Sequence, residues 1–163
     1  MTVSIRPVIS ADAEGLRAIY NVEVLDSTVT MDLVARTLDE QLAWIDRHGG
    51  AHPAIVAEEG PAIVGFASLS PWRDRPAYRG TVENSVYVAR TAQGRGIGRL
   101  LLSQIVQLGA EHGFHTCMAR IAGGNDASVR LHIACGFELV GVERQVGRKL
   151  NRWIDVTVMQ RML

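Results

Sequence analysis

A turn rich in glycine and arginine, residues 93–98 (Gln-Gly-Arg-Gly-Ile-Gly), is the stretch of this sequence best suited to hold a charged ligand. It lies between an alternating β-branched segment, residues 81–89, and a segment from residue 96 to 112 with apolar side chains at helical spacing. A helix start leaves several backbone N–H groups unpaired, and glycine lets a ligand approach them. The turn is bracketed by three arginines: Arg90, Arg95 and Arg99. A capped helix start with solvated arginines is the simpler interpretation, but capping alone does not require so many glycines and arginines, so we predict an anion site for phosphate.

Two common phosphate-binding motifs do not fit this turn. A P-loop needs Lys followed by Ser or Thr after its last glycine, and no such pair follows Gly98. A Rossmann fingerprint needs G-x-G-x-x-G early in a βαβ unit and an acid about 20 residues later, whereas here the spacing is G-x-G-x-G and Glu111 comes too soon. The turn instead resembles the acyl-coenzyme A pyrophosphate loop of the GNAT N-acetyltransferase superfamily. The superfamily signature, Q/R-x-x-G-x-G/A, is matched by Gln93, Gly96 and Gly98.

The resemblance implies that acetyl-coenzyme A (acetyl-CoA) is the co-substrate. Its pyrophosphate would be held by the turn and the helix start, namely Gln93, Gly94, Arg95, Gly96, Ile97, Gly98 and Arg99. The acyl arm would lie along the preceding strand, at Val86, Tyr87 and Val88. Backbone N–H groups at Tyr87 or Val88 would then stabilise the tetrahedral oxyanion of acyl transfer.

A second segment with the superfamily pattern runs from Asn125 to His132 and is closed by Gly136-Phe137. In these enzymes an Asn and a Ser, here Asn125 and Ser128, contact the pantetheine arm, and a Tyr four residues before the Gly-Phe pair protonates the leaving thiolate. His132 takes the place of that tyrosine and departs from the superfamily pattern. An imidazole can supply a proton near pH 7, so we predict the same role for His132. A packed histidine, and an Asn125 that only caps a helix, are the structural alternatives.

Further matches narrow the resemblance to the phosphinothricin, methionine sulfone and methionine sulfoximine N-acetyltransferase subfamily. They are Trp72-Arg73-x-Arg75-x-x-Tyr78, Thr81-Val82-Glu83, Gly147-x-Lys149 and Trp153-x-Asp155. That subfamily has a His and an acid at the positions of His132 and Glu83, and it acetylates the α-amine of small amino-acid analogues. Glu83 would take a proton from the amine, directly or through water, although a solvated strand acid is the alternative. We expect Glu83 to need a β-bulge, because it lies on the strand face opposite Val86 and Val88.

The resemblance also implies a set of acceptor-binding residues and a homodimer. Arg73 or Arg75 would fork onto the carboxylate and the sulfone or phosphinate oxygens of the acceptor, with Tyr78 and Lys149 in the same pocket. Solvated loop arginines are the alternative. Other acceptors, such as a peptide amino terminus or another small amine, and a non-catalytic acyl-CoA-binding module remain open. A cationic acceptor is disfavoured because arginines at the pocket would repel it.

Composition sets limits on the class of protein. With 163 residues, 47% of them apolar and 21% charged, the chain is expected to form a single domain, residues 1–163. Residues 1–60 hold four Arg and ten Asp or Glu (net −6), and the remainder has the opposite balance. A cationic second part suits an anionic ligand, but without a basic run or interleaved aromatic residues we expect no nucleic-acid partner. The absence of a long apolar run or signal-like start predicts no membrane partner and a cytoplasmic location. No metal site is expected, because the histidines lack a third ligand nearby in sequence.

Periodicity predicts the elements that position these residues. We expect strands at 3–7, 54–57, 62–69, 81–89, 115–121, 137–146 and 153–162, and helices beginning at Ser10, Thr37, Gly96 and Asp126. The loops are expected at 26–36, 71–80 and 147–152. This order indicates an α+β fold with a mixed, mostly antiparallel central sheet of about seven strands and helices on both faces, as in the GNAT fold.

Overall fold

The computed structural model describes residues 2–163, which fold around a seven-stranded sheet of order β1-β2-β3-β4-β5-β7-β6. The strands are β1 (Val3–Pro7), β2 (Ala54–Glu59), β3 (Ala62–Pro71), β4 (Thr81–Val88), β5 (Thr116–Ala122), β6 (Glu138–Lys149) and β7 (Arg152–Met162). The helices are α1 (Ala13–Asp26), α2 (Leu38–Arg47), α3 (Ile97–Glu111) and α4 (Asp126–Ala134). β4 and β5 run parallel, and the other neighbouring strands are antiparallel. The predicted fold class is confirmed.

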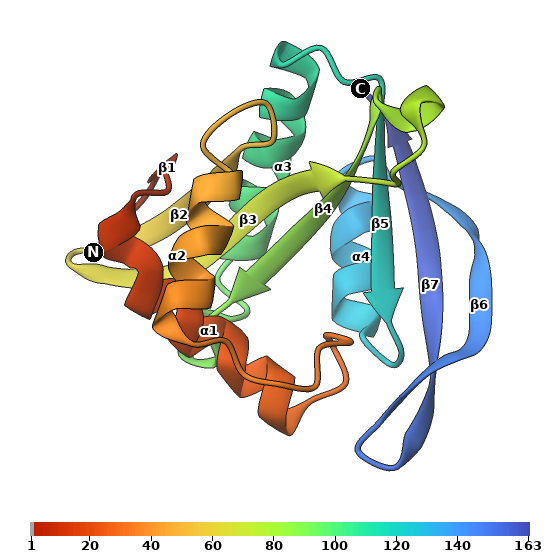
Figure 1. Cartoon of the computed structure of the whole chain (residues 1–163), viewed down its shortest axis with the longest axis horizontal. Helices are drawn as coiled ribbons and strands as arrows, with labels where there is room; N and C mark the ends of the chain where they lie inside the picture. Colours follow the sequence, from red (N-terminus) through yellow and green to blue (C-terminus); the bar gives the residue numbers. More distant parts are fainter. Residues whose placement is uncertain (1) are drawn as a thin grey trace.

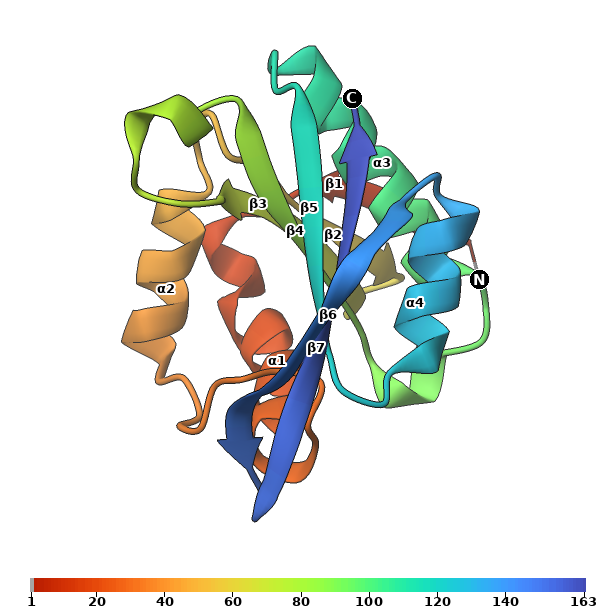
Figure 2. The same cartoon turned by 90° about the vertical axis from the view of Figure 1, so that its right-hand side faces the viewer.

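Each face of the sheet has its own apolar core. α1 and α2 cover one face and α3 and α4 the other, which Figures 1 and 2 show from two sides. On the first face Leu16 and Tyr20 of α1 pack against Phe66 of β3. On the second face Leu101 and Ile105 of α3 pack against the strands. The alternation of side chains along each strand therefore decides which core a residue joins.

The sheet opens between its two parallel strands. β4 and β5 are paired only where Thr81, Val82 and Glu83 face Thr116, Cys117 and Met118. Beyond that point the strands diverge into a V, visible in the middle of Figure 1. β3 stays paired with β4 as far as Val88, and β7 stays paired with β5 as far as Ala122, so each arm of the V is held from its outer side. The inner edges of both arms are left available to a ligand.

The β-bulge expected in β4 is absent. The register of β4 against β3 runs without a shift from Val82↔Pro71 to Val88↔Gly65. The expectation was wrong because it assumed an intact sheet, in which a carboxylate on one face and backbone on the other cannot meet. The V removes that restriction, since side chains of both faces border the opening. Shifts in register occur in β2, between Ala57 and Glu58, and in the β6–β7 pair.

Two further local expectations need correction. The loop expected at residues 147–152 is a two-residue turn, with Leu150 and Asn151 at φ of 48° and 59°, and β6 runs as far as Lys149. Asp12, rather than Ser10, accepts the N–H of Ile9 at 2.9 Å, so α1 begins after a short 3-10 turn. The start of α2 is as predicted, because Thr37 and Glu40 bond reciprocally in a capping box.

The tip of the β6–β7 hairpin holds the segment that joins α1 to α2. Lys149 is buried, and its Nζ donates to the backbone oxygens of Glu23 (3.2 Å) and Thr30 (2.8 Å). A Cβ on Gly147 would collide with the end of the Met31 side chain, so a larger residue there would have to displace Met31. The hairpin thereby fixes one wall of the V from far along the chain. None of the helices in the described chain has the length and hydropathy needed to cross a bilayer.

Adjacent leucines of α3 provide a test of the packing. Leu101 is fully buried between α3 and the sheet, whereas Leu100 is 52% exposed. We expect Leu101→Ala to lower the free energy of unfolding by about 3 kcal/mol, and Leu100→Ala, the matched control, by about 0.5 kcal/mol or less. Urea denaturation of both variants measures the difference. Equal losses would show that α3 does not pack on the sheet through the Leu101 side.

Candidate active site

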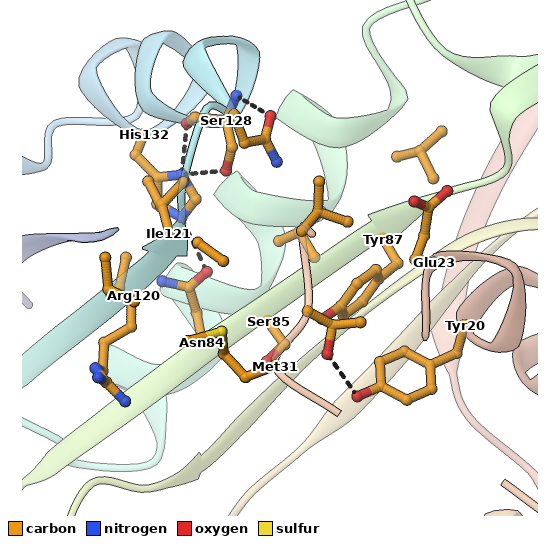
Figure 3. A pocket seen from close by; sticks show the side chains of 18 of the residues that line it. Tyr20, Glu23, Met31, Asn84, Ser85, Tyr87, Arg120, Ile121, Ser128 and His132 are labelled. Carbon is orange, nitrogen blue, oxygen red and sulfur yellow. Dashed lines mark hydrogen bonds between the residues drawn. The ribbon is translucent and has the colours of Figure 1, made fainter. Parts of the chain in front are cut away.

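A cavity of about 640 Å³ occupies the opening between β4 and β5. Its walls come from α1 and the segment after it, from both arms of the V, and from α4, as Figure 3 shows. The volume is in the range of small-molecule sites. Residues from the two faces of the sheet are therefore brought to a single cavity.

The two sides of the cavity differ in chemistry because strand residues alternate between faces. Glu83, Ser85 and Tyr87 belong to the face covered by α1 and α2, where Tyr87 contacts the ring of Tyr20. Val86 and Val88 belong to the face covered by α3. A ligand on each side of the sheet could thus reach the same point within the V.

Glu83 has the properties expected of a base in this cavity. Its side chain is half-buried at the last paired position of β4. Burial raises the pKa of Glu83 above its ordinary value; the nearby charge of Arg120 lowers it and that of Glu143 raises it. The predicted base therefore lies in the cavity, with a pKa shifted toward neutral pH.

His132 projects from α4 into the same cavity, with both ring nitrogens in contact with protein oxygens. Nδ1 lies 2.7 Å from the backbone oxygen of Ser128, which can only accept, so Nδ1 carries a hydrogen. Nε2 lies 3.1 Å from Oδ1 of Asn84, and Nδ2 of the same amide donates to the backbone oxygen of Met118 at 3.1 Å. Two acceptors favour the doubly protonated ring. Burial opposes that charge and lowers the pKa of His132 below its ordinary value.

Asn84 was missed by the sequence reasoning. Its side chain is buried where β4 and β5 separate, and it connects β4 both to Met118 of β5 and to His132 of α4. The side-chain amide of Asn84 thus connects β4 to β5 one residue beyond the last backbone pair, Glu83 and Met118. A signal was present in the sequence, because Asn84 interrupts the apolar row of Val82, Val86 and Val88 with a polar side chain.

The glycine turn has the unpaired amides expected of an anion site. Gly94 and Gly96 have φ of 74° and 81°, a conformation that favours glycine, and α3 begins at Ile97. Within residues 2–163 the N–H groups of positions 94–98 make no hydrogen bond. Gln93 borders the cavity and donates to the backbone oxygen of Val88 at 3.2 Å. The open amides therefore lie next to the cavity, where an anion can reach them.

Two of the three bracketing arginines have acidic partners. Arg95 pairs with Glu59 at 2.6 Å and Arg90 pairs with Glu23 at 2.8 Å. Arg99 forms no ion pair among the described residues. The acids of β2 and α1 thus position two guanidinium groups beside the turn, and an anionic ligand would share or replace these pairs.

The pairing of β4 with β3 narrows the choice of oxyanion donor. Ala89 donates its N–H to Val64 of β3 at 2.9 Å. Because N–H groups alternate in direction along a strand, that of Tyr87 also faces β3, and those of Val86 and Val88 face the opening. Of the two amides predicted from the sequence, the structure leaves Val88 available.

Asn125 and Ser128 both line the cavity at the start of α4. The Asn125 side chain accepts the N–H of Ser128 at 3.1 Å, so Asn125 caps the helix as the structural alternative proposed. Ser128 Oγ lies 3.4 Å from Nδ1 of His132. These residues therefore also position His132.

Of the residues predicted to bind the acceptor, Glu83 lines the cavity and the other four do not. Arg73 lies on the loop before β4, with its guanidinium 5.0 Å from the Trp72 ring and 5.8 Å from the Tyr78 ring. The cavity lining does not include Arg73, Arg75 or Tyr78. Lys149 is also absent from the lining, and its Nζ donates to backbone oxygens of Glu23 and Thr30. The sequence reasoning placed these residues by motif alone, and it missed Arg120, which does line the cavity.

The remaining candidates for chemistry are engaged elsewhere or inert. Cys117 is fully buried, and burial raises its pKa to about 12, so it is a thiol at neutral pH. Cys135 is also buried. In the part of the chain that the structure describes, no three His, Cys, Asp or Glu side chains are grouped as metal ligands.

Comparison with known proteins agrees with this geometry. Residues 5–158 match the family described as acetyltransferase (GNAT) domain. The chain is 40% identical over 162 residues to the L-methionine sulfoximine/L-methionine sulfone acetyltransferase of Pseudomonas aeruginosa, covering 98% of this chain and 94% of that protein. It is 40% identical over 165 residues to the phosphinothricin N-acetyltransferase of Streptomyces coelicolor, covering 99% and 96%.

Solved structures that are similar to this chain are also acetyltransferases. The GNAT superfamily phosphinothricin acetyltransferase of Sinorhizobium meliloti, in complex with acetyl-CoA, has a TM-score of 0.95 at 37% identity and covers 100% of this chain and 89% of that chain. The protein yncA of Salmonella typhimurium, with its cofactor acetyl-CoA, has a TM-score of 0.97 at 37% identity, covering 100% and 95%. The open sheet with a glycine turn beside the V is thus the fold of acetyltransferases. The chain belongs to the GNAT acetyltransferase family, as the resemblance in its sequence predicted.

The contact between Asn84 and His132 predicts opposite effects of two substitutions. Asn84→Ala removes an acceptor that favours the charged ring, so the pKa of His132 should fall further. Asn84→Asp places a negative charge at the same position and should raise the pKa of His132 by about one unit or more. An NMR titration of the histidine ring protons measures both shifts.

His48 of the same protein serves as an internal control. It is also buried, but it caps the end of α2 and its ring contacts Trp44 and Ser70, so neither substitution should move its pKa. If the pKa of His132 shifted in the same direction in Asn84→Ala and Asn84→Asp, the contact between Asn84 and His132 would be contradicted.

Proposed function

We propose that this chain transfers the acetyl group of acetyl-CoA to the α-amine of a small amino-acid analogue of the phosphinothricin, methionine sulfone or methionine sulfoximine type. The observation that carries the proposal is a half-buried Glu83, with a raised pKa, in a cavity that is also lined by Gln93, the residue just before the unpaired amides of positions 94–98. The names of relatives at 40% identity over nearly the whole chain support this class of acceptor.

The residues present fit acetyl-CoA as co-substrate. The unpaired amides of the turn suit its pyrophosphate, and the inner edge of β4 at Val86–Val88 suits its extended pantetheine arm. Asn125 and Ser128 border the same path from α4. The cavity then leaves the side of Glu83 and Tyr20 for the acceptor.

The proposed reaction is a direct transfer within a ternary complex. Glu83, directly or through water, takes a proton from the acceptor ammonium, and the free amine attacks the thioester carbonyl. The N–H of Val88 would stabilise the oxyanion that develops. As the C–S bond breaks, Nε2 of His132 would exchange its contact with Asn84 for the departing thiolate and donate a proton or a hydrogen bond to it. No covalent enzyme intermediate is needed, in agreement with the buried, protonated state of Cys117.

Replacement of the base tests the proposal. We expect Glu83→Gln to lower kcat with methionine sulfone by about 10²-fold or more, because the amide cannot take a proton. The acidic limb of the wild-type pH-rate profile, which falls as Glu83 becomes protonated, should disappear in the variant. The affinity for acetyl-CoA should stay near that of wild type.

Release of free coenzyme A thiol, measured across a panel of amines, provides the readout and the control. Glu111→Gln changes an exposed acid at the end of α3 and should leave the rate and profile unchanged. Preference for a peptide amino terminus over methionine sulfone would overturn the proposed acceptor class, and thiol release with no amine would overturn acetyl transfer altogether.

We also propose that the chain acts as a cytoplasmic homodimer. The cytoplasmic location is supported by the proposed co-substrate, a metabolite of that compartment. The dimer is supported by β6, the outermost strand of the sheet, which has a row of side chains more than half exposed: Leu139, Val140, Val142 and Val146. An apolar edge strand of this kind is normally covered.

Multi-angle light scattering tests the dimer. We expect wild type to have twice the mass of the chain at micromolar concentration, and Val142→Asp to shift it to the monomer because a charge would be buried at the interface. Ile9→Asp, at an exposed apolar residue outside β6, should remain dimeric. A monomeric wild type would contradict the proposal.

A further inference from the structure

Arg120 is a cavity residue that the motifs did not identify. It lies on β5, two residues beyond Met118, which faces Glu83 at the last paired position of the V. Two residues of strand correspond to about 7 Å, so Arg120 stands across the opening from Ser85. Met118 and Arg120 point to the same face of the sheet as Glu83, the face on the acceptor side of the cavity. Figure 3 shows its side chain beside Asn84 at the edge of the cavity.

The guanidinium of Arg120 is held from one side only. Its Nη2 donates to Oε2 of Glu143 on β6, and both side chains are 37% exposed. Within residues 2–163 its Nε and Nη1 donors have no partner. An arginine held by a single carboxylate oxygen can still fork onto a second carboxylate. Arg120 is thus oriented by β6 and still has donors to offer.

The chemistry of the acceptor requires a cation close to Glu83. In an α-amino acid the amine and the carboxylate are attached to the same carbon atom, so an amine placed at Glu83 brings a carboxylate to its immediate surroundings. Two carboxylates so close together repel each other unless a positive charge lies between or beside them. Among the residues that line the cavity, the charge that acts on Glu83 is that of Arg120. Arg90, the other cavity arginine, is paired with Glu23 of α1.

We infer that Arg120 binds the α-carboxylate of the acceptor, with Glu143 as the residue that orients it. The assignment rests on the proposed function and narrows it to acceptors with a free carboxylate next to the amine. Arg73 and Arg75, which the motif suggested for this contact, lie outside the cavity lining. A carboxamide in place of the carboxylate would lose the ionic contact and should be a poorer acceptor.

The test compares two acceptors in wild type and in Arg120 variants. L-Methionine sulfone and its α-carboxamide share the amine and the side chain, and differ in the charge that Arg120 would bind. We expect Arg120→Met to lower kcat/KM for the acid 10- to 100-fold, the range expected for a charge-assisted contact. For the amide, kcat/KM should change about threefold or less in Arg120→Met. In Arg120→Lys, kcat/KM for the acid should lie between the values of wild type and Arg120→Met, because lysine keeps the positive charge but cannot form two parallel hydrogen bonds.

The ratio of acid to amide separates binding from an indirect effect. Arg120 also lowers the pKa of Glu83, so Arg120→Met changes the base as well. That change acts on the deprotonation of both acceptors, and comparing the acid-to-amide ratio of the variant with that of wild type removes the part of the effect that the two acceptors share. Arg130→Met, which removes an exposed arginine of α4, is the matched control and should keep the wild-type ratio. Thermal melting and the affinity for acetyl-CoA establish that each variant is folded.

Each other outcome has a definite meaning. If Arg120→Met lowers kcat/KM equally for the acid and the amide, the carboxylate assignment is wrong. If wild type acetylates methionine sulfone but the acid-to-amide ratio is unaffected by Arg120, only this inference fails. If wild type acetylates no amino acid at all, the proposed function fails, and the Arg120 assignment with it.

Discussion

The early end of the pairing between β4 and β5 is the constraint on which the site depends. The ladder stops at Glu83 and Met118, and the amide of Asn84 makes the last connection before the strands part. If the sheet continued, the amides of Val86 and Val88 would pair with β5 and the two faces would be sealed from each other. Because it does not, the carboxylate of Glu83 on one face and the imidazole of His132 on the other border the same space.

Polar groups buried at the edges of the V tie together elements that are distant in sequence. His132 of α4 is fixed through Asn84 to β4 and β5, and Lys149 of the last hairpin is fixed to the segment after α1. Each of these groups would be costly to bury without a partner. Their partners therefore specify how α4 and the hairpin dock, and the shape of the cavity depends on contacts made by residues that do no chemistry themselves.

Local patterns predicted most of the elements, and they failed where a distant partner decides. The glycine turn, the start of α2 and the helix that follows the turn depend on nearest neighbours in the chain, and all were predicted. The bulge in β4 was expected because strand parity was considered without knowing where pairing would stop. The sequence marks Asn84 as a polar break in an apolar row, but the partners of Asn84 and Arg120 could not be predicted, since they lie 34 and 23 residues away in sequence.

The sequence by itself determined the fold class and the family, and it identified three candidates for the chemistry: the carboxylate of Glu83, the imidazole of His132 and the glycine turn at 93–98. These are encoded by periodicity and short motifs, which require only neighbouring residues. The tertiary structure alone decided which of them meet, which amide faces the opening, and which arginine lies beside the base. The physical reason is that a strand dictates the face of each side chain, while the separation of two strands is set by side chains from other elements.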